Sequence, residues 1–303
     1  MKTKIAVCVL ILSFSVICVW LAVPMATGQI ITPITDPLAV HIPDGEIDNL
    51  YTKSGPVVNV KHSKFGAVGD GVTDDTAAFS SAIATLASGG TLAIPPGTYL
   101  VSGVIVNKSN ITISAAGATL KNSGAGDTLI IQASPAGIVV NVRVSGLILN
   151  GNSTGATGIS IVTGTQIFID DVHVYGHLDN GIEIIGSVPG ASTHCVVTNT
   201  RITADPARLA TAAGVSIGGP GVSTTNSLRS VYVDGYAYGL WDAGVGTHTF
   251  SNTYESCTDA VVTTGGAGVY IADWIEAASG YHYQIGDSRT TIIGPHDTAL
   301  ANI

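Results

Sequence analysis

Short segments of alternating apolar and polar residues recur along most of this chain. From about residue 103 onward no long stretch has the spacing of an amphipathic helix. Instead, a glycine followed by alternating apolar residues recurs at Gly158, Gly181, Gly214 and Gly239, and more loosely near residues 260 and 280. A second alternating segment follows each of these. A repeat at roughly constant intervals of 20 to 33 residues is typical of a β-solenoid and is not expected of a β-sandwich.

Aligning the second segments predicts which side chains point into the solenoid, because successive residues of a strand face opposite sides. One inward column is apolar and consists of Val174, Ile202, Val233, Tyr254 and Ile275. A second, weaker column consists of Val172, Thr200, Val231, Asn252 and Asp273. We expect the amide of Asn252 to pair with a neighbour inside the coil and Asp273 to mark a bulge.

Residues 57–103 have a different pattern, in which one short helix is expected among strands. An apolar strand at 57–60 leads to a glycine-rich turn at 66–71, and apolar residues at helical spacing then predict a helix near 75–87 that Gly89-Gly90 ends. Thr73, Asp74 and Asp75 are expected to accept hydrogen bonds from the first helical N–H groups. Two further strands are predicted at 91–94 and 98–101.

The segments FGAVGDGVTDDTAAF and GGTLAIPPGTYLVSG closely resemble the opening of the pectate-lyase-like superfamily, in its rhamnogalacturonase and epimerase-like branch, which also supplies phage tailspikes. The resemblance implies an all-β fold, a right-handed single-stranded parallel β-helix over residues 57–303 with a short N-terminal capping helix. A cap is physically reasonable because an open end of the stack exposes unpaired strand groups and apolar side chains.

Composition agrees with one large solenoid domain. The 303 residues are 46% hydrophobic and only 11% charged, with 37 glycines, which suits short stacked strands better than a helical bundle. The net charge of −9 disfavours nucleic acid as a partner. Cys195 and Cys257 are too few for a disulfide framework and are expected to be buried free thiols.

The N-terminal residues are expected to form a separate targeting segment. Lys2 and Lys4 precede an uncharged run at 5–23, so residues 1–28 are read either as a signal peptide cleaved after Gly28 or as an uncleaved membrane anchor. Both readings place the protein outside the cell or on its surface. The proline-containing residues 29–56 are expected to form an extended lead-in arm.

The resemblance brings no catalytic residue with it. Hydrolases of the superfamily use clustered aspartates, a Gly-His-Gly and an Arg-x-Lys, whereas this chain has no Gly-His-Gly and reads Arg201-Ile202-Thr203 where the basic pair is sought. Asp70, Asp74 and Asp75 belong to the shared motif, but turn formation and helix capping explain them. No metal-ligand spacing of a known type appears.

On either side of the apolar inward column, side chains point outward in two further columns. One of these is rich in acids and the other in aromatic and basic residues, and together they provide the candidate chemistry. Acids at adjacent coils would lie about 4.8 Å apart along the stack, and flat aromatic faces can pack against sugar rings. An ordinary solvated face would also carry such acids. His177, Asp179 and Glu183 form a second, weaker cluster. The candidate catalytic residues are Asp234, Glu255 and Glu276, and the candidate substrate-binding residues are Tyr232, Trp274, Tyr175, His173 and Arg201.

Two functions are consistent with the sequence. The leading hypothesis is an exported enzyme that cleaves an extracellular polysaccharide as a glycoside hydrolase or a polysaccharide lyase. No cofactor is expected, except calcium if the protein is a lyase. The alternative is a non-catalytic β-helix that binds glycans or builds a cell-surface or tailspike-like assembly, including a homotrimer, because the final coil has no evident cap.

Overall fold

The computed structural model describes residues 5–11, 15–21, 57–133, 137–186, 192–219 and 223–297. The chain divides into two units, residues 1–46 and 47–303. In the first unit, β1 (Ile5–Ile11) pairs antiparallel with β2 (Ser15–Leu21). No helix within the described ranges is long and apolar enough to cross a membrane. The predicted lead-in arm lies outside the described residues, and cleavage or anchoring of residues 1–28 stays a prediction.

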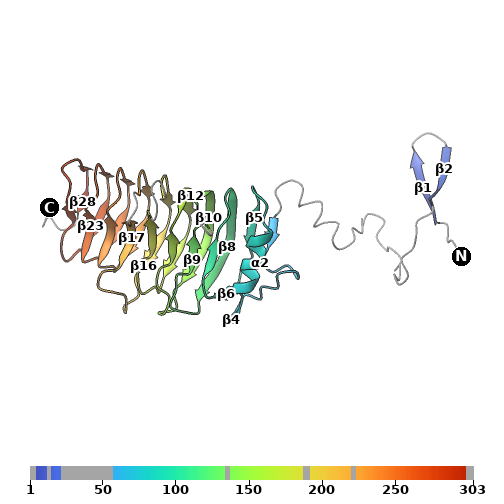
Figure 1. The fold of residues 1–303 in the computed structure, drawn as a ribbon, viewed down its shortest axis with the longest axis horizontal. Coiled ribbons are helices and arrows are strands. Elements are labelled where there is room, and N and C mark those ends of the chain that lie inside the picture. Colours follow the sequence, from blue (N-terminus) through green and yellow to red (C-terminus); the bar gives the residue numbers. More distant parts are fainter. Residues whose placement is uncertain are drawn as a thin grey trace. The chain divides into compact units, whose positions relative to one another are not determined.

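The second unit is a parallel β-helix of about eight coils, in agreement with the solenoid that the repeat predicts and with the fold that the resemblance implies (Figure 1). One of its walls is an eight-stranded sheet to which each coil contributes one strand, in sequence order. The strands of this wall, here called the third face, are β7 (Val104–Val106), β9 (Leu129–Ile131), β11 (Ile159–Ile161), β14 (Ile182–Ile185), β17 (Ala213–Gly218), β20 (Tyr238–Asp242), β23 (Asp259–Thr263) and β26 (Tyr283–Ile285).

The other strands form two further walls joined along one corner. The first face consists of β3 (Val57–Asn59), β5 (Thr91–Ile94), the first halves of β8 (Ile111–Asn122) and β10 (Val139–Asn150), β12 (Gly164–Asp170), β15 (Val196–Thr198), β18 (Ser227–Arg229), β21 (His248–Phe250), β24 (Val269–Ile271) and β27 (Thr291–Ile293). The second face consists of β4 (Asp70–Asp74), β6 (Thr98–Val101), the second halves of β8 and β10, β13 (His173–Tyr175), β16 (Arg201–Thr203), β19 (Tyr232–Asp234), β22 (Thr253–Glu255), β25 (Trp274–Glu276) and β28 (His296–Asp297).

A single residue with positive φ turns the chain from the first face to the second. In β10 this residue is Gly146 (φ 69°), where an added Cβ would collide with the carbonyl oxygen of Ala115 on the preceding coil. In later coils Asn199 (φ 49°) and Ser230 (φ 53°) make the same turn. Asparagine tolerates this conformation better than most residues. Because this turn recurs in successive coils, the strands of both faces keep the same register along the stack. This register aligns the side chains of the candidate site.

Helix α2 (Thr76–Thr85) lies at the N-terminal end of the stack (Figure 1). Phe79 and Ile83 are buried, and the ring of Phe79 meets that of Tyr99 edge-on at 5.4 Å. The helix is confirmed at 76–85 instead of 75–87, and it covers the first coil as expected of a cap.

The predicted capping interactions are only partly correct. The Asp74 carboxylate does accept the Thr76 N–H at 2.9 Å. Asp75 makes no side-chain cap bond, because its carboxylate accepts the N–H groups of Val68 (2.7 Å) and Gly69 (3.1 Å) in the glycine-rich turn. The Thr73 hydroxyl donates to Asp70 instead. Asp75 therefore ties the turn to the helix start.

Both inward columns are confirmed, since every member is 2% exposed or less. The Asn252 amide donates to Asp273 (3.2 Å) and its carbonyl accepts the Val231 N–H (2.9 Å). Asp273 is not a bulge residue. It is buried, and its carboxylate also accepts the Thr249 hydroxyl at 2.7 Å. Cys195 and Cys257 are buried free thiols, as predicted.

Candidate functional site

The second face carries all eight residues that the sequence nominated, in the predicted register. His173 pairs with Arg201, Arg201 with Tyr232, and the column continues through Thr253 to Trp274. The neighbouring column runs through Tyr175, Thr203, Asp234, Glu255 and Glu276. Because a parallel ladder places register partners about 4.8 Å apart, side chains from five coils form one continuous outer surface.

One end of this surface is aromatic and basic. The guanidinium of Arg201 lies 4.5 Å from the ring centroid of Tyr232, and the rings of His173 and Tyr175 are 5.1 Å apart. A groove of about 420 Å³ adjoins them and includes Arg201, His173 and Asn199 in its lining. Burial, followed by the charge of Arg201, lowers the pKa of His173. The imidazole is therefore neutral near pH 7 and can accept or donate a hydrogen bond to a sugar hydroxyl.

The other end is acidic. Asp234, Glu255 and Glu276 lie on three successive coils, and the Tyr232 hydroxyl donates a hydrogen bond to Glu255. This hydrogen bond, with burial, raises the pKa of Tyr232 to about 12, so the phenol keeps its proton. Glu255 is thus held as an acceptor. Trp274 is 42% exposed and stacks on His296 at 5.8 Å, which leaves one ring face open to a ligand.

A second carboxylate cluster lies at the edge of the third face. Burial raises the pKa of Glu183 on β14, and the nearby charges of Asp179 and Asp127 raise it further. Burial also raises the pKa of Asp179. Trp241 is in the same outward column as Glu183, two coils further on. A carboxyl whose pKa is raised by burial and by like charges is suited to act as a general acid.

The sequence identified only part of this second cluster. His177 was grouped with Asp179 and Glu183, but it lies inside the coil, where its Nε2 meets the Thr128 hydroxyl at 2.8 Å. Burial lowers the pKa of His177 to about 4. Asp127 was missed, because its coil lacks the glycine that marks the start of the later segments. His282, on a later coil, is buried as well.

The family model for rhamnogalacturonase A/epimerase, pectate lyase-like proteins matches residues 57–274. The chain belongs to this family. The match starts at β3 and reaches the first residue of β25, so it includes nearly all of the second face. The resemblance read from the capping segment is confirmed.

Several curated proteins match part of the chain, and two of them show the range. Mannuronan C5-epimerase AlgE5 of Azotobacter vinelandii is 39% identical over 115 residues, which are 33% of this chain and 11% of the epimerase. The pre-neck appendage protein of Bacillus phage phi29 is 32% identical over 138 residues, 40% of this chain and 16% of that protein. The chain therefore spans a small fraction of the length of each.

A solved alginate lyase from Paenibacillus sp. str. FPU-7 has the same fold, with a TM-score of 0.58 at 15% identity over 74% of this chain and 94% of the lyase. This similarity shows the fold alone. Within the described residues of this pectate lyase-like chain, no three His, Cys, Asp or Glu side chains gather to hold a metal ion. The calcium expected of a lyase stays a prediction.

Proposed function

We propose that this protein is an exported β-helix that cleaves an extracellular polysaccharide bound along its second face. The observation that supports the proposal is the register of that face, which sets an aromatic and basic end beside three stacked acids. Tyr232, Trp274, Tyr175, His173 and Arg201 would bind the glycan. Partial similarity to an epimerase named for mannuronan supports a polysaccharide substrate.

The acids offer two spacings for hydrolysis. Neighbours such as Asp234 and Glu255 are about 5 Å apart at the backbone, near the separation in retaining glycosidases. Asp234 and Glu276 are about 10 Å apart, at the upper edge of the inverting range. Since the Tyr232 hydroxyl donates to Glu255 and holds it as an acceptor, we assign Glu255 the role of nucleophile or base and a neighbouring carboxyl the role of general acid.

Glu183 and Asp179 provide a second location for the proton donor, since burial raises the pKa of both. Asp179 lies in the turn between β13 and β14, and Glu183 lies on β14 of the third face. Substitutions in each set therefore locate the reaction. If only Glu183→Gln abolishes cleavage, the activity belongs to the third face.

The direct test screens a panel of polysaccharides for new reducing ends. Glu255→Gln and Glu276→Gln are each expected to lower the rate about 10² to 10⁴-fold, the usual contribution of a general acid or base. Asp287→Asn serves as the control, because it removes an equally charged carboxylate whose partner is the exposed Arg289. Parent-like rates in both glutamate variants would show that these residues are not catalytic. An ultraviolet-absorbing, calcium-dependent product would indicate a lyase.

Oligomeric state separates cleavage from the alternative of a glycan-binding or structural assembly. Partial similarity to a phage pre-neck appendage protein supports testing that alternative. Light scattering is expected to show that the mature protein is a monomer, and the reducing-end assay is expected to show that this monomer degrades a polysaccharide. A stable trimer without cleavage would contradict the proposed function. Detection of the protein outside the producing cell tests its export.

A further inference from the structure

Three arginines on the outside of the β-helix are each followed, one coil later, by an aromatic residue in direct register. The pairs are Arg143 with Phe168, Arg201 with Tyr232, and Arg229 with Phe250. A guanidinium can lie over such a ring and gain about 0.5 to 2 kcal/mol from the cation–π interaction. The three pairs therefore start from the same backbone geometry and can be compared directly.

The first two pairs are closed. The guanidinium of Arg143 lies 4.3 Å from the centroid of Phe168, and that of Arg201 lies 4.5 Å from the centroid of Tyr232. Both rings are only partly exposed as a result. In each pair the arginine occupies the ring face that a ligand would use.

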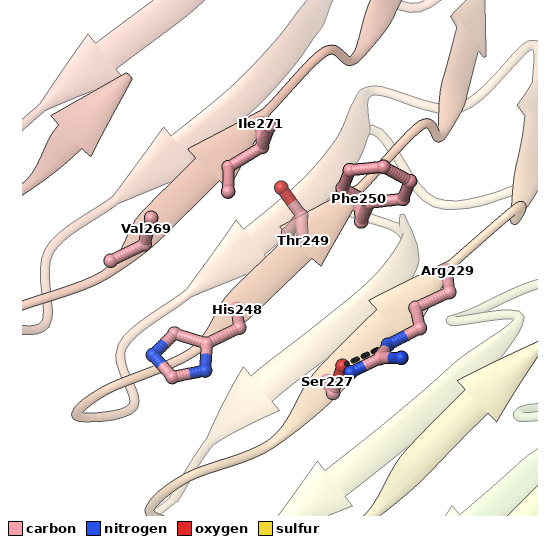
Figure 2. Close-up of a pocket in the computed structure, with 7 residues that line it drawn as sticks. All are labelled: Ser227, Arg229, His248, Thr249, Phe250, Val269 and Ile271. Carbon is pink, nitrogen blue, oxygen red and sulfur yellow. Dashed lines mark hydrogen bonds between the residues drawn. The ribbon is translucent and has the colours of Figure 1, made fainter. Parts of the chain in front are cut away.

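The third pair is open. Arg229 Nε donates a hydrogen bond to the Ser227 hydroxyl at 3.3 Å, and Figure 2 shows the guanidinium turned toward Ser227 and away from the Phe250 ring. Phe250 is 51% exposed. Val269, Ile271 and His248 complete a groove of about 410 Å³ around the pair. Both the ring face and the guanidinium are thus available to one ligand.

The groove favours an anion. Among the residues of β15, β18, β21, β24 and β27 on this face, Arg229 is the one with a full charge. The nearest acid in its column, Asp170 of β12, lies two coils away and accepts hydrogen bonds from Thr198 and Asn199. No acidic side chain among the described residues lies within ion-pair distance of Arg229. An uncompensated guanidinium recognises a carboxylate through two parallel N–H bonds.

We propose that this groove on the first face binds a sugar unit that carries a carboxylate. The carboxylate would pair with Arg229, and the apolar face of the sugar ring would pack on Phe250. One coil separates the two residues, about 4.8 Å, so a single pyranose ring spans both contacts. Ser227 keeps the site open by holding the guanidinium off the ring. The proposal does not depend on cleavage at the second face.

The experiment measures binding to the full chain by titration calorimetry, with an oligomer of mannuronate as the probe and a neutral gluco-oligosaccharide of equal length for comparison. Arg229→Gln is expected to weaken mannuronate binding about 10 to 100-fold, the value of a charge-assisted hydrogen bond. Ser227→Ala should weaken it several-fold, because Arg229 can then close over Phe250 as the other two arginines do. Arg143→Gln, at a closed pair, is the matched control and should bind like the parent.

Several results would overturn the proposal. These are no binding by the parent protein at millimolar probe, equal binding of the neutral oligosaccharide, or parent-like binding by Arg229→Gln. An equal loss in Arg143→Gln would show non-specific charge attraction instead of a site. Arg201→Gln reports on the second face separately, so a loss there with normal binding by Arg229→Gln would place the ligand on that face. Circular dichroism of each variant confirms that it folds.

Discussion

Replacing Asp273 by asparagine should stabilise the protein at neutral pH. Asp273 is buried inside the penultimate described coil, where its carboxylate accepts hydrogen bonds from Thr249, from the Asn252 N–H and from the Asn252 amide. An asparagine at this position keeps one carbonyl for Asn252, and the Thr249 hydroxyl can turn to accept from the new amide. The substitution therefore removes a buried charge, while Thr249 and Asn252 each keep a hydrogen bond to residue 273.

The magnitude follows from the ionisation of the buried carboxyl. Burial raises the pKa of Asp273 from 3.8 to about 6, against the hydrogen bonds, which lower it. At about 1.4 kcal/mol per pH unit, this disfavours the ionised form in the folded state by about 3 kcal/mol. Between pH 4 and 6 the folded protein binds more protons than the unfolded chain, so the free energy of unfolding falls as the pH rises. Above pH 6 the full penalty applies.

Urea unfolding at several pH values between 4 and 7.5 measures this effect. Asp273→Asn should match the parent near pH 4 and exceed it by up to about 3 kcal/mol at pH 7.5. Asp287→Asn makes the same change of net charge at a partly exposed site, where hydrogen bonds from Arg289 hold the pKa of Asp287 low, so the stability of this variant relative to the parent should not rise with pH. A difference between Asp273→Asn and the parent that stays constant with pH would refute the reasoning, as would a less stable variant at pH 7.5.

Two further substitutions test the cap and the turn between faces. Asp75→Ala leaves the N–H groups of Val68 and Gly69 without their acceptor and should lower the free energy of unfolding by about 3 kcal/mol. Asp70→Ala, in the exposed part of the same turn, should lower it less. Equal losses in the two variants would contradict the tie between the turn and the helix start. Gly146→Ala should lower the free energy of unfolding by more than roughly 1 to 2 kcal/mol, which is the cost of an alanine in the left-handed conformation. The added Cβ would also collide with the backbone of Ala115. Gly117→Ala has a similar φ of 73° and open space around it, so thermal melts showing equal losses for both glycines would rule out the collision.

The sequence by itself determined the architecture, because the information is local and repeated. Alternation within each segment assigns Val233 or Tyr254 to the inside whatever the neighbouring coil contains. Repetition then fixes which residues stack, and with it the whole second face from His173 to Glu276. The capping helix was predictable for the same reason, since its apolar spacing and flanking glycines are contiguous in the chain.

The structure decided the contacts that depend on which side chains meet across coils. Asp75 accepts N–H groups from a turn that folds back on it, although its position in the sequence is that of a helix cap. Asp127 approaches Glu183 only because the third face stacks their coils, and burial then raises a pKa that the sequence does not reveal. Arg143, Arg201 and Arg229 have equivalent registers, but the third guanidinium donates to the Ser227 hydroxyl, a contact that the register does not reveal. Backbone register follows from local pattern, whereas side-chain direction and ionisation follow from the packed surroundings.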